Sequence, residues 1–411
     1  MGEVSVTKRD VFHTLSTRMA VSGLRQNNER AVMTAVALGN GPSAAEVART
    51  TGLGAQTVAR IANELESQHL LYRGEPRRGQ RGQPAVPIYT NPEGAYSIGC
   101  EIGWRSLHML IRNLGGQVLL EHHVDYAYPD TKFVIAEITK RTRSMIEAVP
   151  EDQRDRIIGL GIASPSNIGR NADLLGTPLE AAQAWRDLDL AGRLKAETGL
   201  EISVMNDGNA ACWAELAALP SPRPANMAYF LISTFVGAGL IAQGALWEGP
   251  SGNSANLGSM LVTDRNGDQT FVHLIASIFA FERRLRAAGR EVPPGNPAEW
   301  DWDALEPLTT EWINDSARAI AKTITNTKAV MEFDLAVVDG IMPRAITERL
   351  AAQVQYHSDQ QPVLTSDRAV VKVGHRGAIA PAMGAALRLL FRRFYSRDPV
   401  DLMEDANAKA G

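Results

Sequence analysis

Residues 42–71 read PSAAEVARTTGLGAQTVARIANELESQHLL. Ser43 stands where a helix N-cap is preferred, and Glu46 follows three residues later, which are the two positions of a capping box. Gly52 is placed to end that helix, because glycine readily adopts the left-handed conformation found at helix C-termini. A further helix is expected from about Ala55. The stretch therefore predicts two short helices joined by a tight turn.

Four apolar side chains recur at helical spacing on the second of these helices: Val58, Ile61, Ala62 and Leu65. They are expected to pack against the preceding helix and against an earlier one predicted over residues 30–38. The opposite face is polar, and the side chains near its start are Gln56, Thr57, Arg60 and Asn63. Because a recognition helix enters the DNA major groove by its N-terminal end, these four are predicted to meet base edges.

A basic hairpin follows the helices. Residues 70–72 and 86–89 have strand patterns, and the tip between them is rich in arginine and glycine. Its predicted DNA contacts are Arg77, Arg78, Arg81 and Gln83. Helices and hairpin together predict a winged helix-turn-helix over residues 1–90. The alternative is a small helical unit with a solvated charged loop, which explains the agreement of cap, turn glycine, periodicity and hairpin less well.

Charge separates this segment from the remainder of the 411-residue chain. Residues 1–90 hold 11 Lys and Arg against 7 Asp and Glu, whereas residues 91–411 hold 31 against 39. A basic head on an acidic body favours phosphate contact by the head alone. The sequence has neither an apolar run long enough for a membrane span nor a hydrophobic signal core at its start, so we expect a cytoplasmic protein.

The pattern after residue 90 predicts an α/β domain over residues 91–411. Three consecutive strands are followed by alternating helices and strands, which is the order of an actin-like, ribonuclease-H-like lobe over about 91–220. Paired strands and long helices predict a second lobe over about 221–380. A terminal helix over residues 381–395 is apolar on one side, and we expect it to pack on the first lobe.

Six motifs are shared with a known family: Thr51-Gly52-Leu53, Thr57-Val58-Ala59-Arg60-Ile61, Arg81-Gly82-Gln83-Pro84, Tyr96-Ser97-Ile98-Gly99, Asn206-Asp207-Gly208-Asn209-Ala210-Ala211 and Gly249-Pro250-Ser251-Gly252. On these motifs the chain resembles the ROK family of sugar kinases and sugar-responsive repressors over nearly its whole length. The resemblance implies a winged helix-turn-helix fused to a two-lobed, sugar-kinase-like domain that binds a ligand and forms homodimers or homotetramers.

The motifs for ATP depart from the family. Its kinases carry Asp-x-Gly-Gly-Thr, whose backbone amides receive phosphates, whereas this chain has Glu101-Ile102-Gly103-Trp104-Arg105. An indole and a guanidinium stand where close phosphate approach needs small residues. A second phosphate segment survives partly in residues 234–239, and residues 339–343 lack the glycine pair expected near adenosine. We therefore expect no bound ATP.

The motifs for zinc depart as well. The family's zinc site joins a histidine in Glu-x-Gly-His to a cysteine cluster, and here the first motif reads Asn256-Leu257-Gly258-Ser259. No cysteine follows over residues 261–282, and His273 alone cannot complete a four-ligand site. The two cysteines of the chain, Cys100 and Cys212, have apolar neighbours and are expected to be buried thiols. The sequence thus predicts no metal and no cofactor.

Candidate sugar contacts remain. In the family's kinases the residue matching Asp207 is the base that deprotonates the sugar, and the residue matching Asn206 holds a neighbouring hydroxyl. Carboxylate and amide groups suit hydroxyl recognition, yet Asn and Asp are also good helix N-caps, so both roles are open. The predicted ligand contacts are Asn206, Asp207, Asn256, Ser259, Ser164 and Asn253.

Three functions are compatible with the sequence. The first is a DNA-binding regulator, expected to be a repressor of carbohydrate genes, that binds operator DNA and a sugar or polyol and is not an enzyme. The second is an ATP-dependent sugar kinase with a DNA-binding head, which Asp207 keeps open. The third is a DNA-binding protein whose cleft binds nothing. The sequence leaves open the effector, the operator and the sign of the response.

Overall fold

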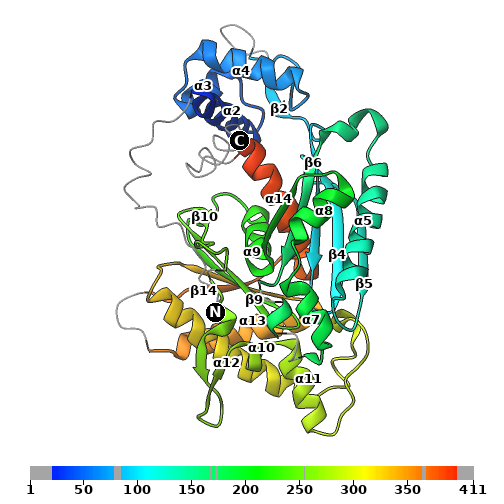
Figure 1. Ribbon diagram of the computed structural model, residues 1–411. Coiled ribbons are helices and arrows are strands. Elements are labelled where there is room, and N and C mark those ends of the chain that lie inside the picture. The colour runs from blue at the N-terminus through cyan, green and yellow to red at the C-terminus, as the bar shows by residue number, and fades with distance from the viewer. Residues whose placement is uncertain are drawn as a thin grey trace. The chain divides into compact units, whose positions relative to one another are not determined.

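The structure is a computed structural model that describes residues 21–77, 85–166, 168–171, 175–253, 255–362 and 367–395 (Figure 1). The chain divides into two compact units. One, here called the head, comprises Met1–Gly94 together with Leu390–Gly411, and the other, the body, comprises Ala95–Leu389. Among the described helices, none is both long enough and apolar enough to cross a membrane.

In its described residues the head contains three α-helices and a two-stranded antiparallel sheet: α2 (Val21–Leu38), α3 (Ala44–Thr51), α4 (Ala55–Ser67), β1 (Leu71–Arg73) and β2 (Ile88–Thr90). A π-helical turn, Phe391–Tyr395, lies against α2, where Thr34 Oγ1 donates to the Tyr395 carbonyl at 3.3 Å. The predicted helices and paired wing strands are confirmed, although α2 begins nine residues before the predicted start.

Local sequence explains the helix ends of the head. The Ser43 backbone N–H donates to Glu46 Oε2 at 2.7 Å, and the Glu46 N–H donates to Ser43 Oγ at 3.4 Å, so the capping box is complete. Gly52 ends α3 with φ of 73°. The tip of the wing, and with it Arg78, Arg81 and Gln83, lies outside the described residues.

The first lobe of the body is a five-stranded sheet in the order β5-β4-β3-β6-β7. Its strands are β3 (Tyr96–Ile102), β4 (Ser106–Asn113), β5 (Val118–Asp125), β6 (Ile157–Ser164) and β7 (Ile202–Asn206). The first three form the predicted antiparallel meander, and β6 and β7 run parallel to β3. The helices of this lobe are α5 (Thr131–Glu147), α6 (Ile168–Asn171), α7 (Leu179–Arg186), α8 (Leu190–Thr198) and α9 (Asp207–Ala218).

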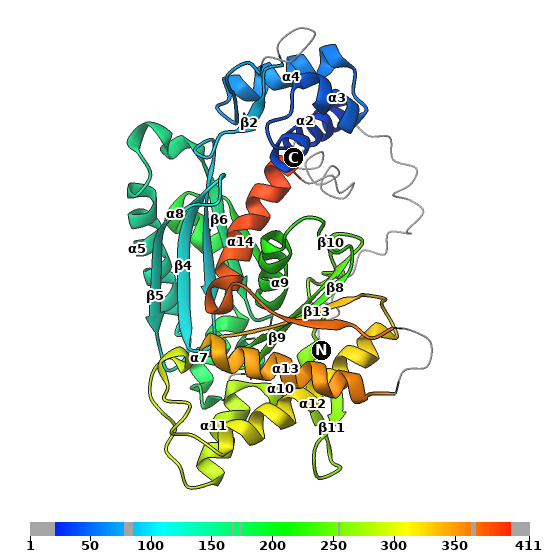
Figure 2. The ribbon, with the colours of Figure 1, turned by 180° about the vertical axis from the view of Figure 1, so that it is seen from behind.

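Opposite faces of this sheet are covered by α5 and by α14 (Ala380–Leu390), as Figures 1 and 2 show. Because side chains alternate along a strand, Ile98 on β3 joins the core beside α5, whereas Gly99 faces α14. A Cβ at Gly99 would overlap the carbonyl oxygen of Ala382, so α14 lies directly on the strand. The expected packing of the terminal helix on the first lobe is confirmed.

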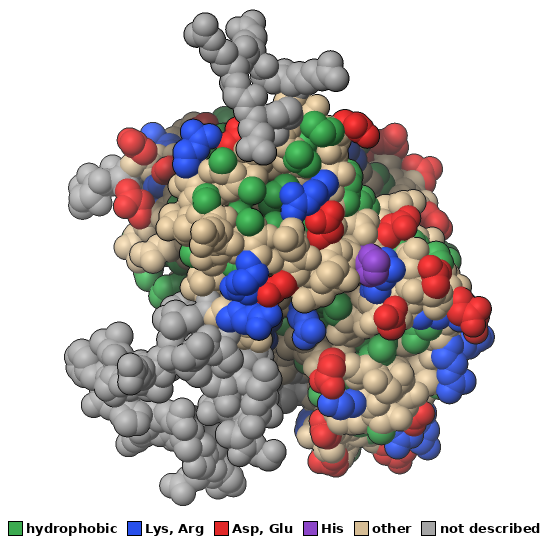
Figure 3. Space-filling view, turned by 90° about the horizontal axis from the view of Figure 1, so that it is seen from above, with side chains coloured by type: hydrophobic (Ala, Val, Ile, Leu, Met, Phe, Trp, Pro, Cys, Tyr) green, Lys and Arg blue, Asp and Glu red, His purple; other side chains and the backbone are tan. Residues whose placement is uncertain are grey.

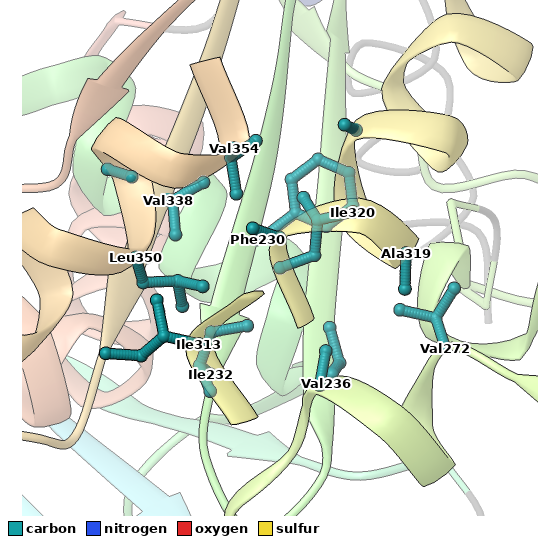
Figure 4. Packing of buried hydrophobic residues seen from close by; sticks show 14 of the residues in the cluster. Phe230, Ile232, Val236, Val272, Ile313, Ala319, Ile320, Val338, Leu350 and Val354 are labelled. Atoms are coloured by element: carbon teal, nitrogen blue, oxygen red, sulfur yellow. The ribbon is translucent and has the colours of Figure 1, made fainter. Parts of the chain in front are cut away.

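The second lobe has a sheet in the order β10-β9-β8-β13-β14. Its strands are β8 (Met227–Ile232), β9 (Val236–Ala242), β10 (Ala245–Leu246), β13 (Leu335–Gly340) and β14 (Val370–Val373), with a separate hairpin of β11 (Leu261–Thr263) and β12 (Gln269–Phe271). The helices are α10 (His273–Ala276), α11 (Ile278–Ala287), α12 (Leu308–Lys328) and α13 (Arg344–Gln360). Phe230, Val338, Ile320 and Leu350 belong to the core between sheet and helices (Figure 4).

Candidate functional site

A cavity of about 350 Å³ lies in the body, lined by residues of both lobes. Five of the six predicted ligand contacts line it: Asn206, Asp207, Asn253, Asn256 and Ser259. The sixth, Ser164, is not in the lining, whereas its neighbours Pro165 and Ser166 are; the Ser164 hydroxyl donates to the Pro165 carbonyl at 3.2 Å. The volume suits a small molecule.

Asn206 both caps a helix and takes part in the polar wall. Its Oδ1 accepts from the Asn209 N–H at 3.0 Å, which satisfies the N-terminus of α9. Its Nδ2 donates to Ser166 Oγ at 3.1 Å and to Asp207 Oδ1 at 3.0 Å. The capping role weighed from the sequence is therefore present, and it orients the amide that holds Asp207.

The Asp207 carboxylate has one oxygen committed to the protein. The Gly208 N–H donates to Oδ1 at 2.8 Å, and the Asn206 amide uses the same oxygen. Among the described residues, these bonds leave Oδ2 to a ligand. Burial raises the pKa of Asp207, repulsion by Glu101 raises it further, and donated hydrogen bonds only partly oppose them, so the pKa is about 6.

His273 was not expected among the ligand contacts, yet it lines the cavity beside Ser259. Burial lowers the pKa of His273 to about 4. The Val236 N–H donates to Nδ1 at 3.1 Å, which places the proton of the neutral ring on Nε2, 3.3 Å from Ser259 Oγ. Gly258 permits this arrangement, because a Cβ there would overlap the imidazole. No three His, Cys, Asp or Glu in the described segments are grouped to hold a metal.

An aromatic wall completes the cavity. Trp104 and Phe235, 7% and 8% exposed, meet edge to face with ring centroids 5.2 Å apart. Phe235 also lies 5.9 Å from the His273 ring and 5.4 Å from Phe279, measured between centroids. Phe271 at the end of β12 is 45% exposed and belongs to the lining. Pattern alone could not select these rings, because four separate segments bring them together.

The turn between β3 and β4 is engaged with protein groups of the second lobe. Both terminal nitrogens of the Arg105 guanidinium, Nη1 and Nη2, donate to the buried carboxylate of Glu282 on α11, the second at 3.1 Å. The Gly103 N–H donates to the Ser106 carbonyl. In this turn Trp104 packs on Phe235, and Arg105 is paired with Glu282.

A second cavity, of about 570 Å³, is lined by Arg105, Thr234 and Ile341, among others. These residues come from the three segments that the family resemblance relates to nucleotide binding. Glu282, the partner of Arg105, lies in the same lining. A cavity therefore lies beside the turn between β3 and β4, and the Arg105 guanidinium that lines it is already paired with the buried carboxylate of Glu282.

The predicted base-reading side chains lie on the open face of α4. Gln56, Arg60 and Asn63 are exposed, and Thr57 is half-buried. Arg60 Nη1 lies 2.7 Å from Glu64 Oε1, and Asn63 Oδ1 accepts from Arg73 at 2.5 Å. On the face seen in Figure 3, basic and acidic side chains are interspersed. These exposed pairs are weak, so contact with DNA can replace them at small cost.

Arg77, the remaining described residue of the predicted wing contacts, lies just before the tip. Its Nη2 donates to the Tyr89 hydroxyl at 3.0 Å and to the Asn40 carbonyl at 3.3 Å. Its backbone pairs with Ala85 in an isolated antiparallel bridge. Arg77 therefore links the base of the wing to the segment after α2 through Asn40 and to β2 through Tyr89.

Comparison with known proteins places these features in one family. The ROK family model matches residues 97–391, which is most of the body. A region of 234 residues is 29% identical to a xylose repressor of Bacillus spizizenii and covers 56% of this chain and 59% of the repressor. The match therefore spans about six tenths of that relative's length. A region of 217 residues is 29% identical to an N-acetylmannosamine kinase of Vibrio cholerae, covering 50% of this chain and 72% of the kinase.

A solved structure shares the whole architecture. The crystal structure of a ROK family transcriptional regulator, a homolog of the E. coli MLC protein, aligns with a TM-score of 0.67 at 20% identity. The alignment covers 93% of this chain and 99% of that one. At this identity the likeness establishes the fold, and the predicted fold class is confirmed.

Proposed function

This chain belongs to the ROK family, and we propose that it is a DNA-binding transcriptional repressor whose affinity for its operator responds to a bound sugar or polyol. The head supplies a winged helix-turn-helix, and the body supplies a cleft with hydroxyl-binding groups. The xylose repressor relative supports a regulator of carbohydrate genes. Two copies of the chain are proposed to place their recognition helices on a two-fold operator.

One observation carries the choice of a sensor over a kinase. Asp207 lines the cavity and uses only Oδ1 in the hydrogen bonds found among the described residues, whereas the turn at Trp104 and Arg105 is occupied by contacts to Phe235 and Glu282. A phosphate loop needs free amides and small side chains to approach the anion closely. The cleft is thus suited to binding a ligand without phosphorylating it, and neither ATP nor zinc belongs to the proposal.

A covalent and packed route connects the cleft with the head. Asp207 begins α9, and Ala210 on α9 meets Gly384 on α14 so closely that a Cβ at Gly384 would overlap the Ala210 carbonyl. The chain continues from α14 into Phe391–Tyr395, which packs on α2 within the head. Ligand binding that favours one position of α9 is therefore transmitted along a continuous helical segment, provided that the ligand prefers one of two states.

A sugar kinase with a DNA-binding head is the second candidate. The cavity of about 570 Å³ at Arg105, Thr234 and Ile341 favours it, as do the retained Asp207 and the kinase relative. Incubating the chain with Mg-ATP and a panel of sugars tests this candidate. Sugar-dependent release of ADP establishes the kinase.

The regulator is tested by recovering genomic DNA fragments bound by the full chain and titrating one of them by fluorescence anisotropy. We expect sequence-selective binding that a sugar or polyol from the panel weakens. A double variant, Gln56→Ala with Arg60→Ala, serves as the control for binding through α4, because both side chains are exposed. Absence of sequence-selective binding contradicts the proposed repressor.

A further inference from the structure

We propose that the cleft takes a sugar or polyol that carries an apolar substituent, such as an aryl or alkyl glycoside. The hydroxyls bind at Asn206 and Asp207, and the substituent lies against Trp104, Phe235 and Phe271. This inference rests on the proposed function, because it names the ligand class of the same site.

The polar part of the cavity is matched to hydroxyl groups. Asp207 and the side-chain oxygen of Asn206 offer acceptors, and Ser166 offers a hydroxyl, whereas both amide hydrogens of Asn206 are already donated to Ser166 and Asp207. Neutral His273 and Ser259 form a second pair of groups that donate or accept. Arginine and lysine are absent from the described lining of this cavity, so a free phosphate or carboxylate on the ligand has no counter-ion.

The other part of the cavity is formed mainly by rings and alkyl groups, and the hydroxyl beside them, that of Ser233, already donates to the Phe235 carbonyl at 2.8 Å. Leu274 and Phe271 belong to the cavity lining, and Trp104 and Phe235 present an apolar surface of rings. A hydroxyl buried against it loses its hydrogen bonds to water without replacement, which costs free energy. An apolar group in the same place gains from burial. A ligand with hydroxyls on every side therefore fits the cavity less well than one with an apolar end.

The two parts adjoin, so one ligand reaches both. Phe235 contacts His273 on one side and Trp104 on the other, with centroid distances of 5.9 Å and 5.2 Å. The volume of about 350 Å³ lies at the small end of the range for ligand pockets, which is about 300–1,000 Å³. It suits one sugar ring with a compact substituent and excludes a long oligosaccharide.

Isothermal titration calorimetry on the full chain tests the inference. The probes are glucose, galactose, mannose and xylose, each as the free sugar and as its α- and β-phenyl glycoside, with phenol as a control. We expect at least one phenyl glycoside to bind about tenfold or more tightly than its parent sugar, and phenol alone not to bind. Asp207→Asn is expected to weaken the glycoside and its parent sugar together.

Two variants locate the substituent. Phe271→Ser is expected to reduce the preference for the phenyl glycoside while leaving the fold intact, because Phe271 is 45% exposed. Phe133→Ser is its matched control, since Phe133 on α5 is 41% exposed and outside the lining. Trp104→Ala, checked for folding by thermal unfolding, is expected to abolish the preference.

The outcomes separate this inference from the proposed function. The ligand class is contradicted if the free sugars bind as tightly as every glycoside. It is also contradicted if the preference for a glycoside survives both Phe271→Ser and Trp104→Ala. Neither result contradicts the proposed sugar-responsive repressor. Failure of all sugars and glycosides to bind overturns the ligand class and the sugar response of the repressor together. Operator titration of the same preparation tests DNA binding independently.

Discussion

At the scale of single residues, Asp207 begins α9 and also lines the cavity proposed to bind the ligand. Its Oδ1 accepts from Gly208 and Asn206 at the start of α9, while Oδ2 remains for a ligand. Burial and the charge of Glu101 raise its pKa to about 6. The carboxylate thus lies in an environment that disfavours its charge, and strongly shifted pKa values of this kind are common at functional sites.

Ligand affinity is expected to depend on pH through Asp207. A hydroxyl donates to the ionised carboxylate, which predominates above the pKa of about 6, so affinity is full near pH 7.5 and falls as the pH drops below 6. At pH 5 about a tenth of the group is ionised, which predicts roughly tenfold weaker binding. Calorimetric titrations from pH 5 to 8 measure this. Affinity independent of pH in the native chain, or the same fall in Asp207→Asn, contradicts the assignment.

Stability is expected to change in the opposite sense. Because the pKa of Asp207 in the folded protein lies above its ordinary value of 3.8, ionisation destabilises the folded protein, and stability is lost as the pH rises from about 4 to 6. The shift corresponds to at most about 3 kcal/mol, and partial exposure reduces this to about 1–2 kcal/mol. Asp207→Asn should therefore unfold at higher denaturant at pH 7.5 and show no such gain at pH 4. A loss of stability at pH 7.5 would show that the carboxylate stabilises the fold.

At the scale of elements, sequence patterns located most helices and strands because each has its own period and ends. The capping box at Ser43 and the strand of Tyr96–Ile102 are examples. The hairpin of β11 and β12 and the short helices α7 and α10 were not predicted, because each is too short to establish a period. Their placement depends on tertiary contacts.

Close packing of α14 on α9 is one such contact, and Gly384 makes it possible. A Cβ at this position would overlap the Ala210 carbonyl, so Gly384→Ala is expected to lower the free energy of unfolding by about 1–3 kcal/mol. Gly54→Ala is the matched control, because its Cβ would meet only Thr57 Oγ1 at 3.8 Å and its φ of −63° suits alanine. Denaturant unfolding compares the two. Equal stability of both variants would contradict the tight contact.

DNA contact is proposed to involve the exposed face of α4. Arg60→Ala should weaken operator binding by about tenfold and relax base preference, because a base-edge contact is worth about 1–3 kcal/mol. Stability should change little, since the Arg60–Glu64 pair is exposed. Arg344→Ala is the matched control: Arg344 pairs with Glu348 at the same four-residue spacing on α13 of the body. Equal operator affinity of the two variants removes Arg60 from the interface.

At the scale of the whole molecule, family membership and fold class could be inferred from short motifs, whereas only part of the cavity lining could be. Asn206, Asp207, Asn256 and Ser259 lie in motifs and line the cavity. Phe271 ends the β11–β12 hairpin, His273 begins the helix after it, and Phe235 lies in the turn between β8 and β9, so only folding brings them into one cavity. The pairing of Arg105 with Glu282 likewise joins residues far apart in the chain.

The central claim is that a ligand bound in the cleft changes the affinity of the protein for its operator, and that the protein does not phosphorylate this ligand. Anisotropy titration of a recovered operator with the full chain tests it, with and without the sugar or glycoside found by calorimetry, and with Mg-ATP added in parallel. The account predicts that the ligand alone changes the operator Kd by about tenfold or more, within the usual range of allosteric coupling, and that no ADP is released. Sugar-dependent ADP release with an unchanged operator Kd would contradict it.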